Sequence, residues 1–241
     1  MGTGMASRLA GALILGGGLA AAAALPASAG YIASQPYKSF ADSPFAPLSF
    51  AAFHLEDFED GLLNTPGLSA NAGTVLTSGS LKDSVDGDDG AIDGSGSAGN
   101  SYYVSTNAVT FAFDATALGG RLPTHVGLVW TDVGFSSNAK GDGYGEVVFE
   151  AFDPFGVSYG VFGPTLVGDG VFGGQTAEDL FLGAIFLGGI SKITVSMRDS
   201  QDWEVDHIQY GVVPVPAALP IMAAALAGFG FAGWRRHRHA A

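Results

Sequence analysis

The fold class is decided most clearly by one stretch of the chain, Lys192-Ile193-Thr194-Val195-Ser196-Met197-Arg198. Its apolar side chains occupy every second position, and polar side chains occupy the positions between them. A period of two places the two kinds of side chain on opposite faces of a β-strand. The stretch therefore predicts a strand that turns one face towards a hydrophobic core.

The same character extends outward through the body of the chain as short apolar runs separated by clusters of Gly, Asp and Asn. These runs predict further strands at 102–105, 109–114, 126–131, 146–152, 157–162, 180–187 and 203–210. No part of the body keeps a helical period for more than one or two turns. We therefore predict an all-β domain at residues 58–212, an antiparallel β-sandwich of jelly-roll-like architecture. Residues 30–57 are expected to form an irregular N-terminal arm or an early edge strand.

The last predicted strand contains a change of parity. Trp203 and Val205 share one face, whereas Ile208 and Tyr210 fall on the other face of a regular strand. All four apolar side chains can be buried together only if the strand contains a bulge. The sequence therefore predicts a bulge near Asp206 and His207.

Composition and charge exclude several classes of site. The 241 residues include no Cys, so disulfides, thiolate metal sites and a cysteine nucleophile are excluded. The stretch between the two ends holds all 23 acidic residues but only six of the ten basic ones, which gives it a formal charge of −17. Phosphate backbones repel such a body, so nucleic acid is not an expected partner.

The N-terminus has the pattern of a secretory signal peptide at residues 1–29. An apolar run from Leu9 to Leu25 follows Arg8, and Pro26 ends it. The small residues Ala27 and Ala29 then form a cleavage site, which predicts that the mature chain begins near Gly30. The alternative is a retained membrane anchor.

The C-terminus, residues 213–241, has the pattern of a membrane anchor. Residues 217–234 form an uncharged stretch of 18 residues, which would span about 27 Å as a helix and so match a bilayer core. A basic cluster that includes Arg235, Arg236 and Arg238 follows at once, as expected for a stretch that stays cytoplasmic. The alternative is a buried helix that ends a soluble domain.

A short proline motif precedes this stretch, and the combination resembles the PEP-CTERM family of sorting signals. The resemblance implies a Gram-negative bacterial protein that is exported, held in the inner membrane and processed by an exosortase. It further implies delivery to the cell surface or the extracellular matrix. The variant here resembles the form ending in Val-Pro-x-Pro-Ala, with the motif residues Val213, Pro214, Val215, Pro216 and Ala217.

Five carboxylates lie within eleven residues and are interspersed with Gly. Calcium binds six to eight oxygen atoms, mostly from carboxylates and carbonyls, and Gly allows a loop to curl around the ion. Without a cation, such converging carboxylates would repel one another. The segment therefore predicts either a calcium loop or a solvated loop, with the candidate ligands Asp83, Asp86, Asp88, Asp89 and Asp93.

Two further segments resemble the opening and closing strands of jelly-roll carbohydrate-binding modules. Phe58-Glu59-Asp60-Gly61 opens the predicted domain, and the strand that begins at Trp203 closes it. In such modules a structural calcium often ties the first strand to the last. The resemblance implies that Glu59 and Asp206 would be the oxygen ligands here; the alternative is an ordinary final strand with exposed acidic residues.

These features favour an exported, non-catalytic surface or matrix protein that binds polysaccharide and calcium. Sugar stacking would need exposed aromatic rings, for which the candidates are Trp130, Tyr144, Tyr159 and Trp203. The first alternative is a surface glycan hydrolase that uses paired carboxylates. Glu146 and Glu150 share a strand face but lie about 13 Å apart, too far for such a pair by themselves. The second alternative is a purely structural matrix component.

Overall fold

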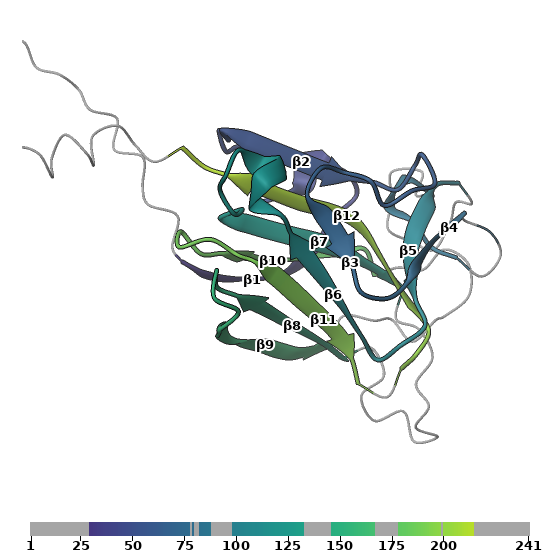
Figure 1. The fold of residues 1–241 in the computed structure, drawn as a ribbon. Coiled ribbons are helices and arrows are strands. Elements are labelled where there is room, and N and C mark those ends of the chain that lie inside the picture. The colour runs from purple at the N-terminus through teal and green to yellow at the C-terminus, as the bar shows by residue number, and fades with distance from the viewer. Residues whose placement is uncertain are drawn as a thin grey trace, which may run out of the picture.

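Two antiparallel β-sheets make up the part of the chain that the structure describes (Figure 1). The structure is a computed structural model, and it describes residues 29–77, 79, 82–87, 98–132, 146–166, 178–198 and 200–214. Within these ranges the helical segments are three short 3-10 turns, η1 (Phe40–Asp42), η2 (Val85–Gly87) and η3 (Ala115–Leu118). None of the helices in this part of the chain is long and apolar enough for a membrane crossing. The predicted cleavage residue Ala27, residues 217–234 and the basic cluster lie outside the described residues.

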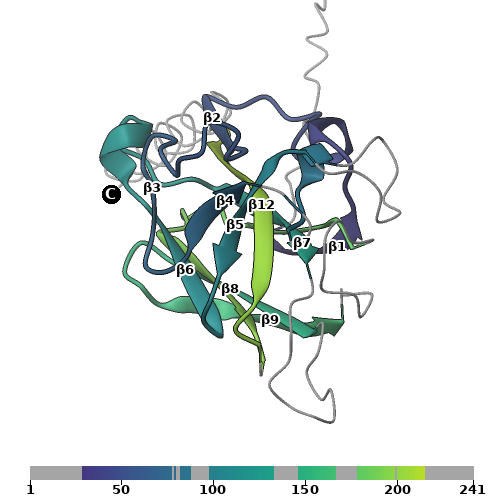
Figure 2. The same ribbon diagram turned by 90° about the vertical axis from the view of Figure 1, so that its right-hand side faces the viewer.

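The larger sheet has seven strands, and β12 lies near its centre (Figures 1 and 2). Six of its strands follow one another in a linear order, and the seventh, β2, pairs with a part of β12 that β5 does not cover. The linear order is β1 (Gly30–Pro36), β10 (Leu180–Ile185), β7 (His125–Asp132), β12 (Trp203–Val212), β5 (Asn100–Val104) and β4 (Thr74–Thr77), and β2 is Ala52–Glu56.

The smaller sheet has five strands and contains the stretch that predicted the fold. Its order is β3 (Leu68–Ala70), β6 (Ala108–Phe113), β11 (Lys192–Met197), β8 (Glu146–Phe152) and β9 (Ser158–Leu166). Strand β11 buries Ile193, Val195 and Met197, as its alternation predicts. These side chains pack in one core with apolar residues of the larger sheet, so the two sheets face each other in a sandwich-like arrangement.

The eight strands expected from the sequence are all present, with ends that shift by a few residues. Three strands were not predicted, β2, β3 and β4, whereas β1 is the early edge strand that was one of the two expectations for residues 30–57. Two of these, β3 and β4, have only three and four residues, which is too short for a period of two to be recognised.

Residues 30–57 do not form an irregular arm. Strand β1 is an edge strand paired with β10, and β2 pairs with β12. The segment between them buries Tyr37 and Phe45 in a second apolar cluster with Phe181 and Val129. This cluster covers the outer face of the larger sheet, which explains why β7 and β12 are buried along their whole length. The sandwich therefore begins near Gly30 rather than at residue 58.

The pairing of β7 with β10 requires glycine at one pair of directly opposite residues. Gly127 pairs with Gly183, and the ring of Phe181 lies over both of them. A Cβ atom at Gly127 would lie 2.2 Å from Phe181 Cζ and 3.0 Å from the carbonyl oxygen of Leu182. Neither atom can yield easily, because the ring is buried and the carbonyl belongs to a central strand.

We predict that Gly127→Ala lowers the free energy of unfolding by about 1–3 kcal/mol, the usual cost of overpacking a core. The measurement is urea denaturation followed by tryptophan fluorescence. Gly79→Ala is the matched control, because a Cβ atom there meets no atom within 4 Å. Equal stability of the two variants would contradict this account of the β7–β10 contact.

Candidate metal centre

The candidate centre lies where β12 exchanges one neighbouring strand for another. On one edge, Trp203 to Val205 pair with β5, whereas Ile208 to Val212 pair with β2. Asp206 and His207 lie in the gap between these two partners. The η2 turn fills the gap, since the backbone N–H of Val85 donates to Asp206.

The predicted bulge occupies this position. On the other edge of β12 the register with β7 shifts between Asp206 and Gln209, which pair with Val129 and Gly127. Two residues of β12 thus oppose one residue of β7. His207 has a φ of 44°, which is unusual for a residue other than Gly. The bulge lets Trp203, Val205, Ile208 and Tyr210 all be buried, as the change of parity requires.

Asp206 is a fully buried carboxylate held by three donors. Its Oδ2 atom accepts from the Ser84 hydroxyl at 3.1 Å and from the Val85 N–H at 3.0 Å. Its Oδ1 atom accepts from the N–H of His207 at 2.6 Å. Among the residues that the structure describes, neither Lys nor Arg forms an ion pair with it. Its negative charge is therefore compensated mainly by neutral donors and by the neighbouring imidazole.

His207 is nearly buried and has a partner at each ring nitrogen. Its Nε2 atom lies 3.0 Å from Asp86 Oδ2, and its Nδ1 atom lies 3.0 Å from the Tyr37 hydroxyl. Gln209 donates to the same hydroxyl at 2.9 Å. A hydroxyl can both donate and accept, so Tyr37 can serve either tautomer of the ring. This arrangement fixes the orientation of the imidazole, as an outer-shell partner does for a metal-bound histidine.

Together Asp86, Asp206 and His207 form a group of three metal-binding side chains. One ligand atom from each residue lies within 4.8 Å of the others, and the side chain of Asp86 is open to solvent. Two carboxylates and one imidazole suit Zn²⁺ and related transition-metal ions. Calcium prefers a shell made only of oxygen atoms, so this group fits zinc better than the calcium expected from the sequence.

Burial and charge shift the pKa values of these groups. Burial raises the pKa of Asp206 to about 7, against the lowering effect of His207, and the charge of Asp86 adds to the increase. For His207, burial lowers the pKa, but the hydrogen bond to Asp86 and the charges of Asp206 and Asp86 outweigh it and raise the pKa overall. The site therefore holds protons near neutral pH that a bound cation would displace.

The seven metal ligands suggested by the sequence have different outcomes. Asp86 and Asp206 are in the three-residue group. Asp83 is buried nearby, where its N–H donates to Glu204 and its Oδ1 atom accepts from the N–H of Ser84. Glu59 accepts from the N–H of Asn100 and so joins the turn after β2 to the start of β5. The group of three does not include Asp83 or Glu59, and Asp88, Asp89 and Asp93 lie outside the described residues.

Sequence reasoning missed His207 and Tyr37. The three histidines of the body, His54, His125 and His207, show no metal-ligand spacing along the chain, so His207 is not among the ligands that the sequence predicts. The available signal was its position beside Asp206 at the predicted bulge. Tyr37 gave no signal, because only the tertiary structure brings a residue 170 positions away to the imidazole.

Two of the four aromatic residues proposed for sugar stacking are in the core. Trp130 and Trp203 are fully buried and stack on each other with ring centroids 5.2 Å apart. Tyr159 stacks on Phe186 at 3.9 Å, and Tyr144 lies outside the described residues. The two tryptophans therefore cannot stack on a sugar ring, whereas Tyr159 is half-buried.

Comparisons with protein-family models, with curated proteins and with solved structures found no match to this chain. The resemblances to PEP-CTERM signals and to carbohydrate-binding modules therefore rest on the residues that carry them.

We predict that the free energy of unfolding falls by more than about 1.4 kcal/mol between about pH 5 and about pH 8. Each unit by which the native pKa of a group exceeds its unfolded pKa corresponds to about that amount. Asp206 and His207 both have a native pKa above the unfolded value. The stability that Asp206 contributes is complete below its unfolded pKa of 3.8 and is lost as the pH rises to about 7. The stability that His207 contributes is complete below its unfolded pKa of 6.5 and is lost as the pH rises through its higher native pKa.

The measurement is urea denaturation across this pH range in the presence of EDTA. Asp206→Asn removes one of the two titrations, so the dependence on pH should become shallower whatever the absolute stability of the variant. An unchanged slope would show that Asp206 has no raised pKa in the native state.

Proposed function

We propose that this protein is an exported, non-catalytic β-sandwich protein of the cell surface or extracellular matrix that binds a divalent cation. The observation that carries the proposal is the convergence of Asp86, Asp206 and His207 at the β12 bulge, within 4.8 Å. The ion would be a transition metal of the zinc class, held by two carboxylates and the Nε2 atom of His207.

The position of the site favours a structural role for the ion. Asp86 and His207 are 121 residues apart in the sequence. A shared cation would fasten the η2 turn to β12 and add binding free energy to the native state alone. In a chain without Cys, such a tie would serve the purpose that disulfides serve in many exported domains.

A jelly-roll-like connection is part of the proposal. From β5 to β12 the chain crosses between the two sheets at every connection except the β8–β9 hairpin. Repeated crossing of this kind is typical of Greek-key and jelly-roll sandwiches.

Export and sorting complete the proposal. Strand β12 ends at Val212, immediately before the proline motif, so the sheet is complete without the motif residues. Pro214 is exposed. This placement supports a role for residues 213–241 as a separate sorting signal, with an exosortase and the export machinery as partners and the inner membrane as the first destination.

The first test of this proposal is metal binding. At a free Zn²⁺ concentration about 100 times the dissociation constant, the free energy of unfolding should rise by about 2.7 kcal/mol. EDTA should reverse the gain. Asp86→Asn should weaken zinc binding at least about tenfold, the lower bound seen when even an outer-shell partner is lost. This variant should still fold, because an amide oxygen can accept from His207.

Glu150→Gln is the matched control, since it removes one carboxylate from the other sheet and should leave zinc affinity unchanged. Isothermal titration calorimetry measures the zinc affinity of the parent protein, Asp86→Asn and Glu150→Gln. Equal affinity for zinc in Asp86→Asn and the parent protein would remove the site. A gain in stability with Ca²⁺ but not with Zn²⁺ would instead favour the Asp-rich segment 83–93 as the metal site.

The second test concerns localisation. Deletion of residues 214–241 should release soluble protein into the periplasm, because the predicted membrane stretch and its basic cluster are lost. Cell fractionation and surface proteolysis measure the outcome. Unchanged surface display of the truncated protein would contradict the sorting role of this segment.

A further inference from the structure

One end of the sandwich exposes large apolar side chains. Phe155 and Val157, in the turn between β8 and β9, are 89% and 62% exposed. Leu187, in the turn between β10 and β11, is 60% exposed. At the opposite end, the described residues between β5 and β6 and between β11 and β12 include no exposed large apolar side chain, and Leu62, 56% exposed beside Thr74 and Tyr102, stands there alone among the described residues. Figure 1 shows that the two apolar turns lie on the side of the molecule where β12 ends.

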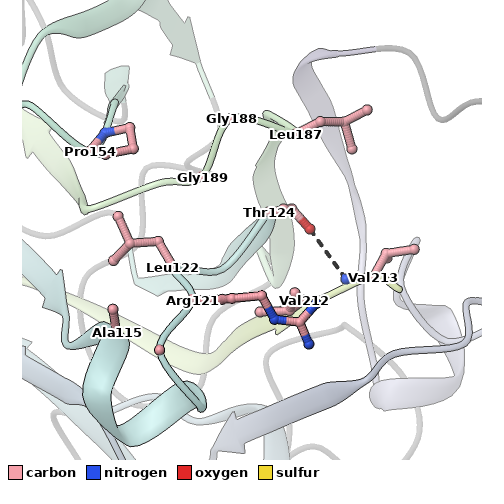
Figure 3. Close-up of a pocket in the computed structure, with 11 residues that line it drawn as sticks. Ala115, Arg121, Leu122, Thr124, Pro154, Leu187, Gly188, Gly189, Val212 and Val213 are labelled. Atoms are coloured by element: carbon pink, nitrogen blue, oxygen red, sulfur yellow. Dashed lines mark hydrogen bonds between the residues drawn. The ribbon is translucent and has the colours of Figure 1, made fainter. Parts of the chain in front are cut away.

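A cavity of about 400 Å³ opens at this end, and its lining is mainly apolar and glycine-rich. Figure 3 shows Leu122, Leu187 and Val213 around it, with the Arg121 side chain close to the end of β12. The N–H of Val213 donates to the Thr124 hydroxyl at 3.3 Å. This contact fixes the point at which the chain leaves the sandwich.

The β8–β9 turn presents Phe155 in a defined position. The Oδ1 atom of Asp153 accepts from the N–H groups of both Phe155 and Val157 at 2.8 Å. The N–H of Asp153 donates to the carbonyl of Val157, and that of Gly156 donates to the carbonyl of Asp153. These four hydrogen bonds fix the backbone of the turn, and the Phe155 ring stands out from it into solvent. Exposure of such a ring is costly unless something covers it.

The course of the chain suggests what covers this end. Ala217, where the uncharged stretch of 18 residues begins, follows Pro214 by three residues. Three residues reach at most about 10 Å. The opposite end of the sandwich lies roughly 30 Å away, at about 3.3 Å for each residue of β12. If residues 217–234 enter a bilayer, the apolar end is therefore the one held against its surface.

We propose that this end of the sandwich rests on the outer surface of the bilayer that holds the C-terminal stretch. Phe155, Val157 and Leu187 enter the interfacial region, and Arg121 lies at the level of the lipid phosphates. The inference rests on the proposed membrane attachment of this protein and adds the orientation and contact surface of its folded part. The charge of −17 on the body disfavours a strongly anionic surface, so the lipid partner is a zwitterionic phospholipid such as phosphatidylcholine.

The absence of Cys allows single-site labelling of the full chain. Leu187→Cys, labelled with an environment-sensitive fluorophore, reports on the apolar end in protein reconstituted into phosphatidylcholine vesicles. Gln201→Cys is the matched control, because this residue is also exposed but lies in the turn at the opposite end. We expect a blue shift of emission and a loss of quenching by aqueous iodide at position 187 but not at position 201. Phe155→Ser and Val157→Ser together should reduce the blue shift at position 187.

Each other outcome overturns the inference in a recognisable way. If the protein floats with the vesicles but iodide quenches both labels equally, the folded part does not touch the bilayer, although membrane attachment stands. If the protein does not float with the vesicles, both the inference and the proposed attachment fail. If the blue shift depends on the ratio of protein to lipid, a second copy of the chain covers this end instead of lipid.

Discussion

The structure depends on one constraint, which is that polar side chains of a fully buried strand need partners from elsewhere in the chain. Strand β12 has no exposed residue, yet it carries Glu204, Asp206, His207 and Gln209. An unpaired buried charge or amide would cost several kcal/mol. Each of the four therefore recruits a segment that is remote in sequence. Their partners are Lys82 and the N–H of Asp83 for Glu204, Ser84 and Val85 for Asp206, Tyr37 and Asp86 for His207, and Ser43 and Tyr37 for Gln209.

This constraint explains why the N-terminal segment belongs to the sandwich. Tyr37 and Ser43 satisfy polar groups of β12, while Phe45 and the ring of Tyr37 cover the outer face of the larger sheet. The same segment thus supplies both the hydrogen bonds and the apolar cover that a buried central strand requires. A truncation at residue 58 would expose Phe181 and Val129, and it would remove Tyr37 from His207 and both Ser43 and Tyr37 from Gln209.

The two regions of interest lie at different points of β12 and meet different physical requirements. At the bulge, a strained backbone, a buried carboxylate and an oriented imidazole are held together, which is an arrangement suited to a cation. At the end of the strand, apolar turns surround the point where the chain leaves. In the proposed arrangement, the first region stabilises the fold in a chain without disulfides and the second orients it on the membrane.

The sequence by itself determined the all-β class, the strands of the body and the bulge in β12. These features follow from alternation along the chain and from the parity of Trp203, Val205, Ile208 and Tyr210, which are local properties. It also indicated Asp86 and Asp206 as candidate ligands. Only the tertiary structure decided that His207 joins them, that Tyr37 orients it and that residues 30–57 cover a sheet. These outcomes depend on contacts between segments more than 100 residues apart, whose energies no local pattern of apolar and polar residues encodes.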